Sequence, residues 1–247
     1  MRLAVHVSGS GARTAVLIHG MMSDHRAWHR VADDLEAQGY RIVAVDLAGH
    51  GRSPRAPRYS VGAWAADVIE SLEPVLERVP DLVMGHSLGG LVASRVVERF
   101  GAGAAIYVDP AFAFPRGLRG AGLKAMFTLS PKPREWLLRR LNPRWSADDV
   151  QLELETLRVW DKRTILGFVS TRALRSPRTL VAPSLVILAE RSLLIAPRDV
   201  ERMRRDGMRV VALAGTGHTV FRDDHAAFMA LVIGWLAEHV PTPALVD

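Results

Sequence analysis

Short, almost uninterrupted apolar runs alternate with longer amphipathic stretches along most of this chain. The runs are rich in Val, Ile and Leu, as the strands of a parallel sheet covered on both faces should be. They lie at residues 14–20, 41–47, 81–87, 104–110, 184–190 and 209–215, with a further candidate at 3–7. Helical patterns separate them, at about 25–38, 60–78, 88–100, 198–206 and 223–239. This alternation predicts an α/β fold with a mostly parallel, doubly wound sheet of about eight strands.

One segment, from about 112 to 178, breaks the alternation and contains no convincing strand. Its short helical patterns are EWLLRRL, DDVQLELETLRVW and TILGFVSTRAL, separated by Gly, Pro and basic residues. A stretch of this length is too long for a plain loop in a compact domain. We therefore expect a helical cap at 112–178, inserted into a core domain made of residues 1–111 and 179–247.

The positive charge of the chain is concentrated in this cap. The whole chain has a formal net charge of +6, whereas residues 112–178 alone hold 14 Lys or Arg and 6 Asp or Glu. A basic rim could attract an anionic substrate, coenzyme A or an acidic acyl carrier protein. A solvated helical surface is the simpler interpretation. Because no nucleic-acid-binding motif accompanies the charge, we expect no nucleic-acid partner.

Composition excludes several other classes of protein. The chain has no cysteine, so disulfides, thiolate nucleophiles and Cys-ligated metals are excluded. No cluster of metal-ligating residues stands out, and we expect neither a metal nor a cofactor. The N-terminus lacks the long apolar run of a signal peptide, and no uncharged apolar stretch reaches the length of a membrane span. We therefore expect a cytoplasmic protein with no membrane partner.

The sequence GHSLGG, at residues 85–90, follows the apolar DLVM and precedes the helical LVASRVVERF. This is the setting of a G-x-S-x-G nucleophile elbow, in which a sharp strand-to-helix turn exposes the serine at the top of the sheet. Gly85 and Gly89 leave room for neighbouring backbone to pack closely. Ser87 is therefore the candidate nucleophile, placed at a helix N-terminus that favours a developing anion.

A serine hydroxyl needs a base, and His218 in AGTGHTV follows the last apolar run. The sequence LIHGMM supplies a turn at Gly20 after the first buried run. The backbone N–H of Met21 and that of Leu88 are then candidate donors of an oxyanion hole. The alternative is that His19 and Gly20 only shape a loop.

Four motifs resemble those of the α/β-hydrolase superfamily in order: HGMMSDHRAW (19–28), DLAGHGRS (46–53), GHSLGG (85–90) and GTGHTV (215–220). The resemblance extends over essentially the whole chain except the cap. It implies a Ser–His–acid triad, an oxyanion hole and a cap that closes over the pocket. A serine at position 87, where an aspartate would indicate epoxide or haloalkane hydrolysis, favours acyl transfer to water.

The acid of the implied triad is the part of the sequence that departs from the family pattern. The family pattern resembles G-D-R-D-P-L-V-P, but here the segment 189–197 reads A-E-R-S-L-L-I-A-P, so Ser192 stands at the usual acid position. Asp109, at the end of the run 104–110, is our assignment. Some family branches, such as certain haloalkane dehalogenases and the fungal zearalenone lactonases, carry their acid at this strand end. Glu190 is the alternative; Asp199, farther along, and the absence of any acid also stay open.

Other polar residues of these motifs are expected to be structural. We expect Asp46 to organise its loop by hydrogen bonding. We also expect His50 and His86 to have structural roles, with the His86 ring pointing away from the pocket.

Aromatic residues suggest an apolar or ring-bearing acyl group. The candidates for substrate contact are Trp28, Phe112, Phe114, Trp136 and Trp160. Most such residues would equally well form the small core of the cap. The sequence thus predicts a serine hydrolase for an ester, lactone or thioester of an apolar small molecule. The alternatives are a biosynthetic acyl transferase or cyclase and a low-turnover ligand-binding protein; the oligomeric state stays open.

Overall fold

The computed structural model of the protein describes residues 1–113, 133–169, 176–177 and 179–240. Its centre is a seven-stranded sheet in the order β1-β3-β2-β4-β5-β6-β7. The strands are β1 Val5–Ser8, β2 Arg13–Ile18, β3 Tyr40–Val45, β4 Leu82–His86, β5 Ala104–Val108, β6 Ser184–Ala189 and β7 Arg209–Leu213. Only β1 runs antiparallel to its neighbour in this sheet. The mostly parallel sheet is confirmed, with seven strands in the described residues.

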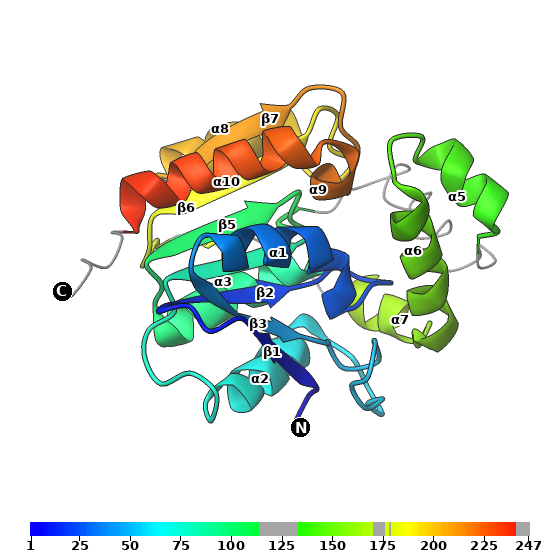
Figure 1. Ribbon diagram of the computed structural model, residues 1–247, viewed down its shortest axis with the longest axis horizontal. Helices are drawn as coiled ribbons and strands as arrows, with labels where there is room; N and C mark the ends of the chain where they lie inside the picture. The colour runs from blue at the N-terminus through cyan, green and yellow to red at the C-terminus, as the bar shows by residue number, and fades with distance from the viewer. Residues whose placement is uncertain (114–132, 170–175, 178, 241–247) are drawn as a thin grey trace.

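Helices cover both faces of the sheet (Figure 1). They are α1 His29–Ala37, α2 Val61–Leu72, α3 Leu88–Phe100, α8 Pro197–Arg205, α9 Val220–Asp223 and α10 His225–His239, with a 3₁₀ helix, η1, at His25–Trp28. Buried side chains of α2, α3 and α8 share one apolar cluster, and those of α1, α9 and α10 share another. The predicted doubly wound arrangement is therefore confirmed.

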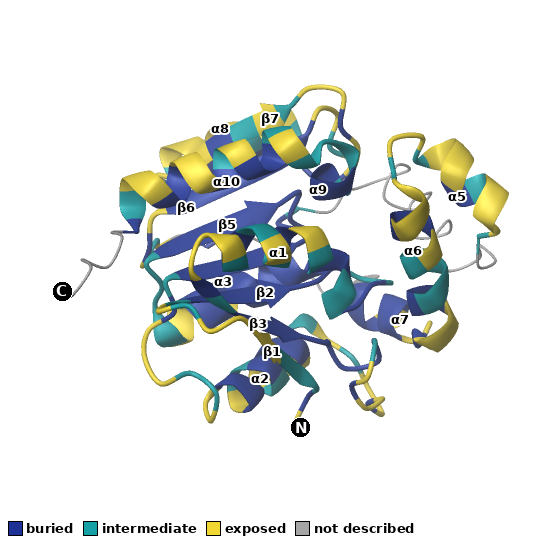
Figure 2. Ribbon diagram, in the orientation of Figure 1, coloured by how far each residue is buried: buried dark blue, intermediate teal, exposed yellow. Residues whose placement is uncertain are grey.

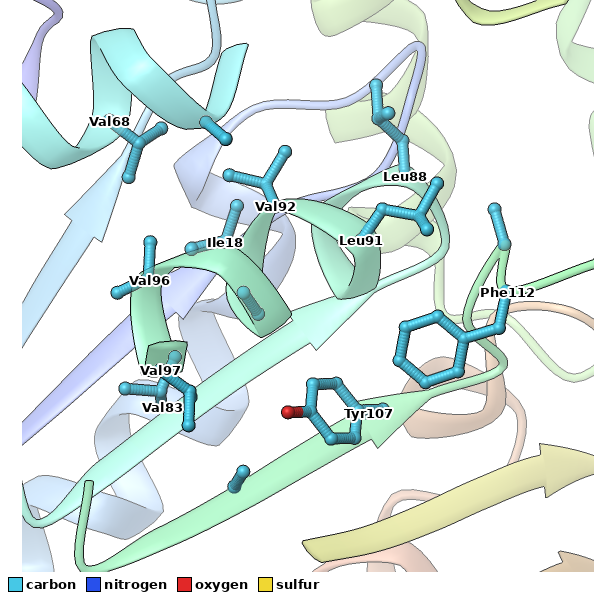
Figure 3. Close-up of a cluster of buried hydrophobic side chains, with 14 of the residues drawn as sticks. Ile18, Val68, Val83, Leu88, Leu91, Val92, Val96, Val97, Tyr107 and Phe112 are labelled. Carbon is cyan, nitrogen blue, oxygen red and sulfur yellow. The ribbon is translucent and has the colours of Figure 1, made fainter. Parts of the chain in front are cut away.

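The five inner strands, β2 to β6, are buried on both faces, which explains why their sequences are continuously apolar (Figure 2). On the α2 and α3 side, Val68 and Val92 share a cluster with Val83 of β4 and Tyr107 of β5 (Figure 3). All four side chains are at most 1% exposed. This packing fixes the ends of β4 and β5, where two of the candidate site residues lie.

The helix predicted over 60–78 is shorter than expected. It begins after Ser60, whose side chain accepts a hydrogen bond from the Ala63 N–H at 3.1 Å, and it ends at Leu72. Pro74 accounts for this end, because a proline lacks the N–H of the next helical bond and its ring clashes with the preceding turn.

Three further helices lie between β5 and β6 in the chain, within the predicted cap. They are α5 Glu135–Leu141, α6 Ala147–Val159 and α7 Thr164–Val169. These match the helical patterns in the sequence, apart from residues 170–174 of the third, which lie outside the described residues. Among the helices that the structure describes, none has the length and apolarity needed to span a membrane.

Candidate active site

Ser87 sits between β4 and α3 in a strained turn, with φ 53° and ψ −117°. The two glycines allow this turn because other backbone passes very close. A Cβ at Gly85 would lie 2.3 Å from the Gly89 carbonyl oxygen, and one at Gly89 would lie 2.2 Å from the Ile18 carbonyl oxygen. The Ser87 side chain is therefore held at the N-terminus of a 13-residue helix.

Backbone strain is concentrated around this turn. In the described part of the chain, the non-glycine residues with positive φ are Met22, Ser87 and Asp109, at 70°, 53° and 34°. They follow β2, β4 and β5, which are neighbours in the sheet. Since these strands are parallel, their carboxyl ends meet at one edge. Residues held in such costly conformations often cluster at functional sites.

Asp109 and His218 form a direct hydrogen bond. The Nδ1–H of His218 donates to Asp109 Oδ2 at 2.6 Å. The carboxylate is fully buried and also accepts from the Ala189 N–H at 3.4 Å, whereas the His218 side chain is 39% exposed. Because Nδ1 carries the proton, Nε2 of the neutral ring has a free lone pair and can accept a proton.

The other carboxylates weighed for the acid have different partners. Glu190 is exposed and accepts from the Gly215 N–H at 3.2 Å. Asp199 caps the start of α8 and pairs with Arg202 at 2.8 Å. Ser192, at the position where the family pattern has its acid, accepts from the N–H groups of Leu194 and Ile195. It thus closes a local turn.

The turn after β2 packs directly against the serine. A Cβ at Gly20 would lie 3.1 Å from Cβ of Ser87. His19 fixes this turn: its Nε2 accepts from the Leu47 N–H at 2.9 Å, so Nδ1 carries the proton and donates to the Gly20 carbonyl at 2.6 Å. Within the described chain, the backbone N–H groups of Met21 and Leu88 donate no hydrogen bond. They are available to an incoming oxyanion.

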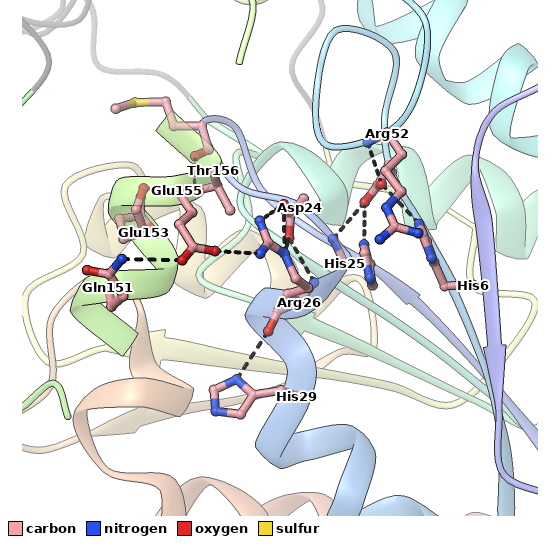
Figure 4. Close-up of polar contacts among 12 residues, drawn as sticks. His6, Asp24, His25, Arg26, His29, Arg52, Gln151, Glu153, Glu155 and Thr156 are labelled. Atoms are coloured by element: carbon pink, nitrogen blue, oxygen red, sulfur yellow. Dashed lines mark hydrogen bonds and ion pairs between the residues drawn. The ribbon is translucent and has the colours of Figure 1, made fainter. Parts of the chain in front are cut away.

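Asp46 organises the loops beside this turn, as expected from the sequence. Its fully buried carboxylate accepts from the backbone N–H groups of His25 and Arg52 and from the side chains of His6 and His25, all within 3.0 Å (Figure 4). Burial opposes ionisation, but these hydrogen bonds, first that of the His25 side chain, hold the pKa of Asp46 well below its usual range.

The same cluster has metal-ligand residue types, since ligand atoms of His6, His25 and Asp46 lie within 4.8 Å of one another. However, the two imidazole rings stack face to face, with centroids 3.4 Å apart and planes 9° apart. Parallel rings direct their nitrogen lone pairs side by side and not at a shared point. The cluster therefore supports these loops through hydrogen bonds, and the participation of His6 and His25 was not predicted from the sequence.

Helix α6 contacts both sides of the candidate site. On one side, Thr156 Oγ1 lies 3.3 Å from the carbonyl oxygen of Met22, and Glu155 pairs with Arg26 at 2.8 Å (Figure 4). On the other side, Glu153 pairs at 2.8 Å with the buried Arg222 of α9, four residues after His218. Helix α6 thus connects the turn after β2 to α9, which follows the loop that carries His218.

Residues 15–231 match the alpha/beta hydrolase family. The chain belongs to this family. As an α/β hydrolase it is 25% identical over 242 residues to the AB hydrolase superfamily protein YisY of Bacillus subtilis, covering 89% of this chain and 90% of that protein. It is 38% identical over 92 residues to the pimeloyl-[acyl-carrier protein] methyl ester esterase of Edwardsiella ictaluri, covering 36% and 33%.

The chain spans only about a third of the length of the curated relatives that it matches at 38–41% identity. Among solved structures, an esterase from Exiguobacterium antarcticum superimposes with a TM-score of 0.78 at 19% identity. That superposition covers 95% of each chain. It confirms the fold of this α/β hydrolase.

Two residues expected to contact substrate belong instead to the core of the hydrolase. Trp28 is 1% exposed and stacks on Phe221, with ring centroids 4.5 Å apart. Phe112 is fully buried against Tyr107, 5.0 Å between centroids, and so packs with the sheet and not with the cap. We therefore correct both assignments, because neither ring is open to a ligand.

The remaining aromatic candidates differ in their surroundings. Trp136 is 63% exposed on α5 and does not line an enclosed site. Trp160 is 5% exposed and shares a small apolar cluster with partly buried Met21 and Met22, so it stays a candidate for the pocket wall. Phe114 lies outside the described residues.

The two histidines expected to be structural also differ. His50 is buried and donates from Nδ1 to the carbonyl of Ala48 at 3.1 Å, which supports a structural role. From the sequence we expected the His86 ring to point away from the pocket. The structure shows that this expectation was wrong. The His86 Nε2 is 2.9 Å from the carbonyl oxygen of His218, because the buried ring turns toward the neighbouring loop.

Proposed function

We propose that this α/β hydrolase is a serine hydrolase that cleaves an ester, lactone or thioester of an apolar small molecule. The observation that carries the proposal is the 2.6 Å bond between His218 Nδ1 and the buried Asp109, beside a serine in an elbow turn. Such a bond fixes the ring so that Nε2 can act as the base, and it stabilises the imidazolium that forms.

In this mechanism the Ser87 hydroxyl attacks the carbonyl carbon while His218 Nε2 takes the hydroxyl proton. The N–H groups of Met21 and Leu88 hold the oxyanion, a stabilisation of several kcal/mol in typical enzymes. His218 then protonates the leaving alcohol or thiol, and the acyl group stays on Ser87. Water, deprotonated by His218, releases the acid. No metal or cofactor enters these steps.

We also propose that the cap at 112–178 covers the pocket. Its described helix α6 contacts the turn at Met22 and the His218 loop, so it lies over both sides of the reacting atoms. Exclusion of water by such a cover strengthens the electrostatic contacts within the site.

The test is labelling with a fluorophosphonate probe. We expect rapid labelling of the wild-type protein and none of Ser87→Ala. Ser94→Ala is the matched control, because Ser94 is a buried serine of the same helix α3 whose hydroxyl bonds the Leu91 carbonyl. Equal labelling of wild type and Ser87→Ala would refute the proposal. Rapid labelling with no turnover of esters, lactones or thioesters would favour the binding-protein alternative.

Product analysis separates hydrolysis from acyl transfer. A hydrolase releases the free acid whether or not an alcohol acceptor is present. If the acyl group passed mainly to the added alcohol, or cyclised onto its own hydroxyl, the biosynthetic alternative would replace our proposal.

One surface favours a thioester carried by an acidic partner as a second candidate substrate. Helix α5 exposes Arg139 and Arg140 beside Trp136, and one relative is by name an esterase for the methyl ester of a pimeloyl-[acyl-carrier protein]. We expect acyl-coenzyme A to react faster than the same acyl group on uncharged N-acetylcysteamine, and that advantage should shrink at high salt and in Arg140→Ala. Equal rates for the two thioesters at low salt would exclude this candidate.

A further inference from the structure

His86 ends β4 and directly precedes Ser87, so the packed sheet that fixes the serine also fixes this residue. Its side chain is 8% exposed. Its Nε2–H donates to the backbone carbonyl of His218 at 2.9 Å, and the two rings lie 4.6 Å apart at an angle of 45°. The residue next to the nucleophile therefore holds the backbone of the proposed base, 132 positions later in the chain.

The His86 ring also touches the other loops of the site. Its edge meets Phe221 of α9, with centroids 5.3 Å apart and planes at 84°. Its Nδ1 faces the turn after β2, where a Cβ at Gly20 would lie only 2.8 Å away. One side chain thus makes contact with the loops that follow β2 and β7, while its own backbone leads into the elbow.

The protonation state of His86 suits such a role. Burial, and next the proximity of His218, lower the pKa of His86 well below its usual value. The ring is then neutral at neutral pH, and since Nε2 donates, Nδ1 carries no proton. A neutral ring provides a donor without placing a second positive charge beside the imidazolium that forms on His218 during the reaction.

From these contacts we infer that His86 is a positioning residue, which holds His218 at the height and angle needed to receive the proton of Ser87. The inference rests on the proposed serine hydrolase function. Asp109 holds one ring nitrogen of a side chain that is 39% exposed, whereas the His86 bond holds the backbone that carries it. Without this bond the imidazole can swing on its loop, and a misplacement of about 1 Å can cost about 100-fold in rate.

The test compares His86→Phe, which keeps a ring but has no donor, with His86→Gln, whose amide N–H can still reach a carbonyl. His239→Phe is the matched control, because His239 also donates a ring N–H to a backbone carbonyl, that of Trp235 at 2.9 Å, and packs on an aromatic ring. It lies at the far end of α10 from α9 (Figure 1).

For His86→Phe we expect kcat to fall by about tenfold or more with KM nearly unchanged, and His86→Gln to recover part of the loss. The acid limb of kcat/KM should move to lower pH in His86→Phe, because a loosened bond to Asp109 supports the imidazolium less. His239→Phe should match the wild type. Unchanged kcat in His86→Phe, or a loss that follows only the unfolded fraction with no shift of the pH profile, would overturn the inference.

Proton NMR tests the positioning role of His86 without requiring enzymatic turnover. The Nδ1 proton that His218 shares with Asp109 should give a downfield signal in the wild type, His86→Gln and His239→Phe. It should broaden or vanish in His86→Phe. An unchanged signal in His86→Phe refutes the positioning role even in a protein without turnover, whereas failure of Ser87 labelling refutes the proposed function alone.

Discussion

Arg222 and Glu153 form a buried ion pair, 2.8 Å between Nη1 and Oε2, that joins the His218 loop to helix α6. Arg222 is 4% exposed, packs over the ring of Trp145 and also approaches Asp149 at 3.4 Å. Burial raises the pKa of Glu153, and the Arg222 charge opposes that rise. The ionised carboxylate therefore depends on the guanidinium.

We predict that Arg222→Met lowers the free energy of unfolding by about 3 kcal/mol, because removing one partner leaves a buried carboxylate without its cation. Urea unfolding measures this change. Arg95→Met is the control, since Arg95 pairs with Glu98 at 2.7 Å on the surface of α3 and should contribute at most about 1 kcal/mol. Equal losses in the two variants would contradict a special role for the buried pair.

Asp109→Asn should lower kcat by about 10⁴-fold, because an amide no longer favours the Nδ1–H tautomer of His218. Glu190→Gln should change kcat less than about threefold, since Glu190 is exposed and its carboxylate accepts from the Gly215 backbone N–H. Steady-state kinetics on one activated ester gives both values. The reverse ranking would assign the acid to Glu190.

Gly20→Ala should reduce fluorophosphonate labelling and kcat together by about 100-fold, the size expected when an oxyanion donor is displaced. The added methyl would lie 2.8 Å from His86 Nδ1 and 3.1 Å from Ser87 Cβ. Gly62→Ala in α2 is the control, because a Cβ there meets nothing within 4 Å. That variant should keep its activity and gain up to about 1 kcal/mol in stability. Full activity of Gly20→Ala would contradict this prediction, because it would show that the turn can accommodate the added methyl group.

Buried neutral histidines should make the protein less stable in mild acid. Burial lowers the pKa of His50 to about 3, whereas the unfolded residue titrates at its ordinary value of 6.5. Between these two pH values the unfolded state binds the extra proton, so the free energy of unfolding rises with pH and falls on acidification. The slope is about 1.4 kcal/mol per pH unit for each such group.

The measurement is the urea midpoint between pH 6.5 and 5, above the range where ordinary carboxylates titrate. The slope should be smaller in His50→Gln, although that variant is less stable at pH 7. His19 and His86, whose pKa values burial also lowers, should retain the rest of the slope. A slope that does not change in His50→Gln would assign the effect to other groups.

Much of this structure follows from local rules in the sequence. Continuous apolar runs located every strand of the described sheet, and the flanking glycines of GHSLGG indicated the close backbone approach seen at Gly85 and Gly89. The strand end at Asp109 was predicted too, because parallel strands bring their carboxyl ends to one edge.

What the sequence did not reveal depends on the orientation of side chains between distant segments. Neither the His86 contact with His218 nor the stacking of His6 on His25 has a local signature, since each joins residues from different loops or strands. Trp28 and Phe112 were misassigned for a related reason. An aromatic residue next to a motif has the same sequence pattern whether its ring faces a ligand or the sheet.

Ser87 and Asp109 lie only 22 residues apart in the sequence. Both belong to one continuous strand–helix–strand unit, which precedes the predicted cap. In the proposed triad Asp109 supplies the carboxylate, so the turn at Ser192 needs none. A sequence survey that required a carboxylate at that turn would classify this protein as an inactive member of the family. For such divergent family members, the position of a carboxylate at the edge of the sheet is a safer criterion than its column in a sequence alignment.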